Sequence, residues 1–440
     1  MTHKSLLTVD ALTRKRNAAE KRFKAYGLGA IIVAMIALAL LLTSVVSTGS
    51  SAFKQTYATI TVPLPTAKLD KSGTRDLAVM KKVTTIGYAS LLRDGMVATV
   101  EELGIATDLN AKTIGKMLSK EASATVRNAV LADPDIVGTD MEFKLLMNGR
   151  IDGYFKGRVT MESAALDGNT SPEELQLAQA LADVGVVDTT FNWAFLTAPD
   201  ASDQRPEAAG LGVAILGSLY MMIVVLVLAL PIGVAASIYL EEFAPKNRWT
   251  DIIEVNISNL AAVPSIVYGI LGLAIFINFM EFNQSSPLVG GLVLTLMTLP
   301  TIIISTRAAL KSVPPSIRDA ALGVGASKMQ AVFHHVLPLA ASGILTGTII
   351  GLAQALGETA PLLLIGMVAF VREYPAAYTP DAGLFGEAAT ALPVQVFNWT
   401  QRADPGFVER ASGAIITLLI FLLIMNAIAI FLRRKFERRW

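Results

Sequence analysis

The chain has 440 residues, of which 53% are hydrophobic and 17% charged, and it contains no cysteine. A soluble globular protein carries about 25% charged residues, so this composition indicates several membrane segments. The formal net charge of +1 excludes the charge excess of a nucleic-acid-binding protein, and the absence of cysteine excludes disulfides, iron–sulfur clusters and cysteine-based zinc sites.

The N-terminal part predicts a first membrane span. Residues 1–26 are polar and basic, and residues 27–46 form an uncharged run of 20 residues, which is long enough for a helix to cross the hydrocarbon core. Lysine and arginine on the leading side predict a cytoplasmic N-terminus. A cleaved signal peptide with a small-residue exit at residues 50–52 is the alternative, and it leaves the orientation of the following segments unchanged.

Residues 47–208 form the one large region without a hydrophobic span. Residues 59–62 alternate like a strand, and Ser171 followed by proline and two glutamates marks a helix start. Asn148 and the glycine after it suggest a hairpin. We expect a small α+β domain outside the cytoplasm, with a ligand that the sequence does not identify, ending in a linker at residues 199–207.

Five further hydrophobic stretches predict the other spans: residues 211–240, 255–280 (interrupted by Pro264), 287–306, 339–371 and 411–432. With the N-terminus inside, six crossings place loop 241–251, loop 307–338 and the C-terminal tail inside. These segments are richer in lysine and arginine than the opposite loops 281–286 and 372–409. The charge bias therefore supports cytoplasmic N- and C-termini.

The segment 309–338, between the fourth and fifth predicted spans, carries a recognisable pattern. It resembles the cytoplasmic coupling loop of ABC-importer permeases, E-A-A-x3-G-x9-I-x-L-P, with Asp319 in place of the glutamate and His335 in place of the isoleucine. The matching positions are Ala320, Ala321, Gly325, Leu337 and Pro338, and together with Asp319 they are the candidate coupling residues. Composition predicts a short helix over residues 316–322, a turn at Gly325 and a second helix. The resemblance implies that this segment receives the motion of a separate ATPase.

The chain has no nucleotide site of its own. No G-x-x-x-x-G-K-[ST] phosphate-binding loop occurs, and the nearest string, which begins at Gly323, lacks the spacing. Neighbouring His334 and His335 point about 100° apart on a helix, so they do not predict a metal site. We therefore expect no bound cofactor, no metal and no enzymatic chemistry, with ATP and magnesium on a partner ATPase.

Glu358 is the one ionisable residue inside the six spans as drawn. An acid in a span is costly unless it faces protein or water, so it is a candidate for function. The neighbouring glycine and proline can open the helix toward a cavity. The candidate translocation-path residues are Glu358, Gln354, Gly357, Thr359 and Arg307. The alternative is a shorter span, with Glu358 at the interface or in a structural pair.

The string at residues 355–363 closely resembles the fifth-span signature of PstA-type permeases of the bacterial phosphate importer, and residues 263–269 and 299–301 resemble further parts of that family. The resemblance covers residues 209–440. Some members carry arginine where this chain has Gln354, and arginine and glutamate where it has Ile304 and Arg307. The anion-path arginines of those relatives therefore cannot be transferred to this sequence.

The resemblance implies a mainly α polytopic protein of the bacterial inner membrane, with a type I ABC-importer permease fold, six transmembrane helices and an α+β extracytoplasmic domain. It also implies a PstC-type second permease, an ABC ATPase dimer, a periplasmic phosphate-binding protein, PhoU/PhoR-type regulators and surrounding lipid as partners. Two alternatives stay open: a permease for another oxyanion (sulfate, molybdate or phosphonate), and a membrane sensor, for which the eight residues after 432 are a short cytoplasmic part.

Overall fold

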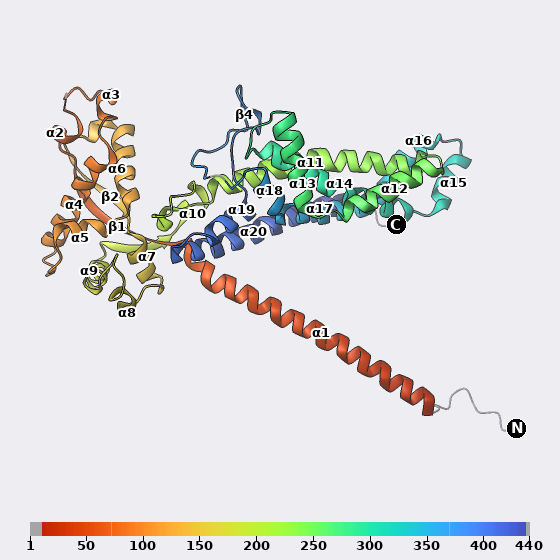
Figure 1. Ribbon diagram of the computed structural model, residues 1–440, viewed down its shortest axis with the longest axis horizontal. Coiled ribbons are helices and arrows are strands. Elements are labelled where there is room, and N and C mark those ends of the chain that lie inside the picture. The colour runs from red at the N-terminus through yellow and green to blue at the C-terminus, as the bar shows by residue number, and fades with distance from the viewer. Residues whose placement is uncertain (1–10, 72, 369, 437–440) are drawn as a thin grey trace. The chain divides into compact units, whose positions relative to one another are not determined.

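The computed structural model describes residues 11–71, 73–368 and 370–436 (Figure 1). The chain divides into two compact units, Met1–Thr48 and Gly49–Trp440. The first unit consists of helix α1 (Ala11–Gly49), which contains the predicted span 27–46 and continues it through the basic residues before it. The first ten residues of the predicted polar N-terminus, and Trp440 at the other end, lie outside the described part of the chain.

The second unit begins with an α+β domain (residues 54–191). Its antiparallel sheet has the order β2-β1-β3, with β1 (Lys54–Pro63) between β2 (Asp140–Leu146) and β3 (Val187–Phe191). The strand predicted at residues 59–62 is confirmed within β1. The helices of the domain are α2 (Thr66–Leu69), α3 (Leu77–Met80), α4 (Thr85–Glu102), α5 (Ala111–Lys116), α6 (Lys120–Ala132), η2 (Pro134–Ile136), α7 (Gly149–Phe155), α8 (Met161–Ala164) and α9 (Pro172–Asp183).

Local sequence explains two of these elements. The helix start at Ser171 is confirmed, because its hydroxyl accepts the amide N–H of Glu174 while the Glu174 carboxylate accepts the amide N–H of Ser171. The hairpin predicted at Asn148 is wrong. The Asn148 side chain accepts the N–H groups of Arg150 and Ile151 and so begins helix α7 instead of a turn.

The core of the domain lies between the sheet and its helices. Ala58, Ile60 and Val62 alternate along β1 and are buried with Leu91 and Met96 of α4. The period of two places all three β1 side chains on one face of the sheet. Full burial of each large apolar side chain contributes about 1.5–3 kcal/mol, which accounts for a stable domain on only three strands.

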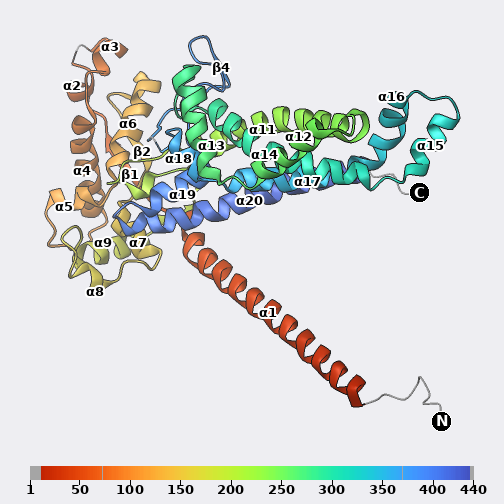
Figure 2. The ribbon, with the colours of Figure 1, turned by 45° about the vertical axis from the view of Figure 1, so that its right-hand side comes forward.

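The rest of the second unit is helical. Short elements η1 (Ser50–Phe53), α10 (Trp193–Thr197) and η3 (Pro206–Ala208) connect the α+β domain to long helices. The others are α11 (Gly212–Ile238), η4 (Tyr239–Phe243), α12 (Arg248–Ala261), α13 (Ser265–Gly272), η5 (Leu273–Phe279), α14 (Pro287–Lys311), α15 (Pro315–Gly323), α16 (Lys328–Ala331), η6 (Val332–Val336), α17 (Leu337–Gly357), α18 (Ala360–Leu364), strands β4 (Tyr378–Thr379) and β5 (Gly383–Leu384), α19 (Leu392–Thr400) and α20 (Pro405–Phe436). Helices α11, α14, α17 and α20 run side by side (Figures 1 and 2).

Among the described residues, five helices are long and apolar enough to cross a membrane, and the pair α12 and α13–η5 makes a sixth if it counts as one span. The prediction of a mainly helical polytopic protein with an α+β domain is confirmed. The interruption at Pro264 is also confirmed, and it is a bend of 100° rather than a small kink. Proline removes a backbone donor and disfavours helix at the residue before it.

One predicted boundary is wrong. The fifth span was drawn to residue 371, but α17 ends at Gly357, because Glu358 takes an extended backbone with ψ of 130°. The linker predicted at residues 199–207 does lie between α10 and α11, and its Asp200 and Glu207 are both buried. Their carboxylates bond to side chains of the helical part and the α+β domain, as described below.

Close glycine contacts define the register of two long helices. A methyl group at Gly347 of α17 would lie 2.4 Å from the Ser305 Cβ of α14, and one at Gly343 would lie 2.7 Å from the Ala309 Cβ. In these two contacts the residue number rises along α17 while it falls along α14, so the two helices are antiparallel. The end of α14 therefore lies beside the beginning of α17, next to the segment that connects them.

Candidate functional site

The predicted coupling segment forms two short helices around a tight turn. Helix α15 covers the predicted helix at residues 316–322, and Gly325 has a φ of +89°, a conformation that favours glycine. Ala321 is buried, whereas Asp319 and Ala320 are exposed. The segment continues through α16 and η6 into α17, where Leu337 and Pro338 are half-buried.

An arginine and a glutamate fix this segment to the long helices. Arg318 of α15 donates to both oxygens of the Glu242 carboxylate of η4: Nη2 to Oε1 at 2.6 Å, and Nε to Oε1 and Oε2 at 3.1 and 3.3 Å. It also donates to the carbonyl oxygens of Val313 and Leu310. Glu242 is 9% exposed. A bidentate bond from guanidinium to a buried carboxylate sets direction as well as distance. Sequence reasoning counted Arg318 only as a basic loop residue; the paired acids at the end of α11 were the available signal.

Arg307, a tentative path residue, belongs to a second ion-pair group beside this segment. It contacts Glu254 of α12 at 2.6 Å and Glu241 of η4 at 3.4 Å, and Lys311 reaches Glu241 at 3.5 Å. These contacts hold the ends of α11, α12 and α14 together. The Arg307 guanidinium is thus engaged by carboxylates of its own chain.

The coupling segment leaves an apolar surface uncovered. Its members share high exposure and lie on α15, the turn, α16 and η6: Leu322 (48%), Val324 (87%), Met329 (58%) and Phe333 (43%). Large apolar side chains that stay exposed together on one short segment are typical of a protein-binding surface. His334 and His335 are exposed beside it, and no group of three or more metal-ligand residues occurs in the described part of the chain.

The second candidate region is the break after α17. Glu358 is half-buried between α17 and α18, with Gly357 and Gln354 exposed and Thr359 half-buried. Within the described ranges, no hydrogen bond or ion pair engages the Glu358 carboxylate. The acid therefore lies at a helix break and not within a continuous span.

Two of the family-like strings meet at this break. A methyl group at Gly269 of α13 would lie 2.7 Å from the Pro361 Cα, so only glycine allows this approach. The Tyr268 hydroxyl donates to the carbonyl of Leu260 at 2.8 Å and so bridges the bend at Pro264. The broken ends of two spans thus pack on one another, and Leu299, from the third string, packs against the same cluster.

The structure does not bring Arg307 and Glu358 together. The glycine contacts above place Arg307 of α14 level with about residue 345 of α17, which is 13 residues before Glu358. At 1.5 Å rise per residue the two lie about 20 Å apart along the helix. They belong to separate places on this chain.

The α+β domain contains a cleft of about 1240 Å³, lined by residues of α4–α7, the start of α9, and Asp404 before α20. Arg150 in its wall pairs with Asp167 at 3.0 Å and lies 3.9 Å from Asp404. Ser119 donates a short hydrogen bond to Glu207, and burial raises the pKa of the Glu207 carboxyl. Its wall thus mixes bases and acids and presents no dominant charge for an anionic ligand.

Comparison with known proteins assigns both parts of the chain. Residues 229–440 match the family of the binding-protein-dependent transport system inner membrane component, and residues 10–165 match a domain of unknown function, DUF3333. The probable ABC transporter permease protein YqgI of Bacillus subtilis is 32% identical over 50% of this chain and 78% of its own length.

The phosphate transport system permease proteins PstA 1 of Mycobacterium tuberculosis (CDC 1551 / Oshkosh) and PstA of Yersinia pestis are each 30% identical, over 53% and 52% of this chain and 73% and 76% of their own lengths. Among solved structures, an inward-facing MetNI methionine ABC transporter is 15% identical, with a TM-score of 0.38 over 52% of this chain and 95% of the matched chain. By its sequence relatives, this chain belongs to the binding-protein-dependent inner membrane components, within the ABC transporter permeases that include the PstA proteins.

Proposed function

We propose that this chain is a permease subunit of an ATP-driven importer of inorganic phosphate, which forms half of the translocation path and couples to a separate ATPase. The observation that carries the coupling role is the exposed apolar surface of α15–η6, held to η4 by the Arg318–Glu242 contact. A segment that transmits motion from another subunit must be fixed to the helices of its own chain and must also be exposed to that subunit. The segment α15–η6 has both properties. The choice of phosphate follows the names of the relatives and the string around Glu358.

The partners follow from this role. The second half of the path is a PstC-type permease, the motor is an ABC ATPase dimer that holds ATP and magnesium, and a periplasmic phosphate-binding protein delivers the substrate; PhoU/PhoR-type proteins regulate the system. The protein spans the inner membrane, with both termini in the cytoplasm and the α+β domain outside it. The positive-inside bias of loop 241–251 and of the coupling segment supports this orientation.

A physical role for Glu358 can be stated. An ionised carboxylate only accepts hydrogen bonds. Phosphate near neutral pH still carries a proton to donate and sulfate carries none, so an unpaired acid at the helix break favours phosphate. Glu358→Gln is expected to reduce phosphate uptake and to raise inhibition of the remaining uptake by sulfate, measured with radiolabelled phosphate. Unchanged uptake and unchanged competition would remove Glu358 from the path.

The cargo is tested in cells from which this gene has been deleted. Uptake of radiolabelled phosphate from a dilute medium should fall by at least about tenfold, which corresponds to about 1.4 kcal/mol in apparent affinity or rate, and plasmid-borne chain should restore it. Sulfate and molybdate uptake should stay unchanged. Loss of sulfate or molybdate uptake with intact phosphate uptake would favour the other-oxyanion alternative.

A further inference from the structure

The α+β domain is attached to the helical part by more than the two connectors of the chain. The first connector, η1 (Ser50–Phe53), joins α1 to β1, and the second, from α10 through η3 to α11, is the one that leads into the long helices of the second unit. Two connectors alone would allow the domain to swing about them. The first turns of α20 supply additional contacts that engage both connectors and the domain itself.

Arg410 of α20 binds both connectors at once. Its guanidinium donates to the Ala52 carbonyl of the first connector at 3.3 Å and to the Glu207 carbonyl of the second at 2.9 Å. It also donates to the Gln55 side chain of β1 at 2.7 Å and lies over the Phe195 ring at 5.2 Å. Arg410 is 2% exposed. The planar fork of arginine suits such simultaneous contacts, which lysine could not make.

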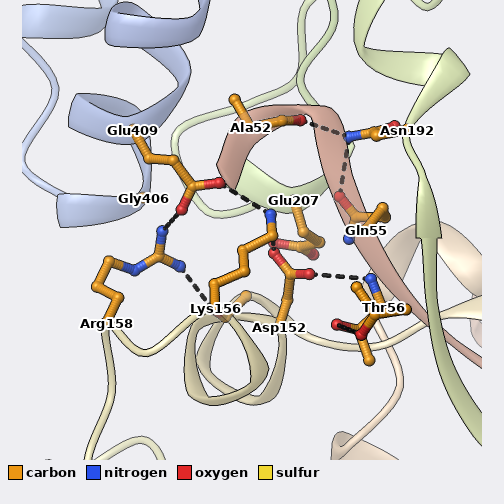
Figure 3. A network of polar contacts seen from close by, with 12 residues as sticks. Ala52, Gln55, Thr56, Asp152, Lys156, Arg158, Asn192, Glu207, Gly406 and Glu409 are labelled. Atoms are coloured by element: carbon orange, nitrogen blue, oxygen red, sulfur yellow. Dashed lines mark hydrogen bonds and ion pairs between the residues drawn. The ribbon is translucent and has the colours of Figure 1, made fainter. Parts of the chain in front are cut away.

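The preceding residue, Glu409, binds the domain directly (Figure 3). Its carboxylate accepts from Lys156 at 2.9 Å and from Arg158, both of which follow α7 at its end. Lys156 also contacts Asp152 at 2.6 Å, and Asp152 accepts the backbone N–H of Thr56 in β1 at 3.0 Å. The Lys156 side chain is 1% exposed. A chain of buried contacts therefore runs from α20 through α7 to the central strand.

A second set of hydrogen bonds joins the second connector to α19. The buried Asp200 carboxylate accepts from the Trp399 indole at 2.9 Å and from the Gln395 amide at 3.1 Å. Trp399 is fully buried, with its ring 6.1 Å from that of Phe195 and 6.4 Å from that of Phe407. The connector that sequence reasoning took for a linker is thus anchored at Asp200 and Glu207.

The chemistry of these contacts favours one fixed arrangement. Apolar residues of similar volume would stabilise the join as well as buried ion pairs do, so stability alone does not explain the charges. An apolar interface can slide, whereas Arg410, Glu409 and Lys156 would lose their partners in a low-dielectric interior if the domain shifted. Breaking one such pair leaves an uncompensated charge in the interior, which opposes a hinge at this place.

We propose that the α+β domain and α20 move as one rigid body during transport, with Arg410 and Glu409 as the positioning residues. The domain is then an extension of the last span, and anything that holds the domain also holds α20. The proposal rests on the proposed ATP-driven transport; the distance measurement below does not depend on the cargo, whereas the uptake measurement rests on phosphate as the cargo.

The chain has no cysteine, so cysteine pairs introduced for spin labelling meet no background labelling from this chain. Suitable exposed sites are Ile86 in the domain (81%), Leu423 on α20 (66%) and Phe279 at the end of η5 (83%). Distances are measured by pulsed electron paramagnetic resonance in the assembled transporter, nucleotide-free and trapped with ATP and vanadate. The Ile86–Leu423 distance should stay constant, while Ile86–Phe279 and Leu423–Phe279 change together. A change in Ile86–Leu423, or no change in any pair, overturns the proposal.

A double variant tests the positioning role. Lys156→Met with Glu409→Gln removes both charges of this pair, while Asp152 keeps the Thr56 N–H as its donor and Arg158 keeps the Gly149 carbonyl as its acceptor. Size-exclusion chromatography checks that the variant is folded. The matched control, Arg75→Gln with Asp135→Asn, neutralises an exposed pair inside the domain. Only the first double variant should broaden the Ile86–Leu423 distribution and lower phosphate uptake by about tenfold or more. An unchanged distribution with full uptake overturns the proposal, and if this variant fails to fold, the distances in the otherwise native chain decide.

Discussion

The coupling segment and the start of α20 are both fixed by arginine and glutamate side chains, but they differ in what remains exposed. At the coupling segment, Arg318 binds Glu242 and the nearby carbonyl oxygens of Val313 and Leu310, and apolar side chains of the same segment stay exposed. At α20, Arg410 and Glu409 each bind several groups, and both are buried. The first arrangement suits a surface that meets another subunit; the second suits a joint inside one chain.

The largest effect is expected from breaking the joint at α20. Arg410→Met leaves the Glu207 carbonyl oxygen without its donor, and it leaves the Ala52 carbonyl and the Gln55 side-chain oxygen with the Asn192 amide as their donor. Loss of one member of a buried ionic cluster costs about 3–5 kcal/mol, so the apparent unfolding temperature and the yield of the purified chain should fall sharply. The exposed Arg434, changed to methionine in the same way, is the control. Equal unfolding temperatures for the two variants would contradict the importance of the cluster.

The coupling segment should respond differently to loss of its arginine. Arg318→Ala leaves Glu242, 9% exposed, without its donor, at a cost of about 1–3 kcal/mol in the free energy of unfolding. Because the coupling segment is then no longer fixed to η4, phosphate uptake should fall further than ATP hydrolysis by the assembled transporter. Lys328→Ala, at an exposed position of the same segment, is the control. A parallel fall in uptake and hydrolysis would argue against transmission of motion through this segment.

A third prediction concerns the packed helix breaks, which have no charge at their contact. Gly269→Ala would place a methyl group 2.7 Å from Pro361 Cα, and overpacking of this kind costs about 1–3 kcal/mol. Gly357→Ala is the matched control in the same region, since a methyl group there meets nothing within 4 Å. Thermal unfolding of both variants in detergent provides the measurement. If Gly357→Ala proves the more harmful, close packing of the two breaks is not what requires glycine at 269.

The smallest expected effect is a pH dependence of the unfolding temperature that comes from Glu207, beside the start of α20. Burial raises the pKa of Glu207, with smaller opposing contributions from the Ser119 hydroxyl and the Arg410 charge, and Asp152 raises it further. The folded state therefore favours the protonated acid, so this contribution to stability is complete below the ordinary carboxyl pKa and is lost as pH rises through the folded-state value. Glu207→Gln should flatten the fall in unfolding temperature as pH rises above the ordinary carboxyl range. Identical slopes for variant and wild type would refute the assignment.

Much of the coupling segment could be predicted from sequence, because its determinants are local. A helix over residues 316–322 and a glycine turn at 325 need only neighbouring residues, and both are present. The partner of Arg318 lies 76 residues away, so no local pattern identifies it. Hydropathy alone extended the fifth span to residue 371, whereas the glycine and proline beside Glu358 already indicated an opening of the helix, and α17 does end at Gly357.

The joint at α20 was not predicted for a related reason. The last span was drawn from residue 411, which left Glu409 and Arg410 in a polar loop where charges are ordinary. In the structure both lie within α20, and their partners are between 203 and 358 residues away. Long-range contacts of this kind are set by the packing of the α+β domain, which a single sequence does not reveal.

The assignment as a phosphate permease coupled through α15–η6 is tested most directly in proteoliposomes containing the assembled transporter, binding protein and enclosed ATP. Phosphate accumulation and ATP hydrolysis are measured in the same vesicles for wild type and for Val324→Asp, which places a charge on the 87% exposed residue of the apolar surface. The wild type should accumulate phosphate in proportion to hydrolysis, and the variant should lose both ATPase binding and accumulation while keeping its unfolding temperature. Full accumulation by Val324→Asp, or sulfate accumulation in place of phosphate by the wild type, would contradict the assignment.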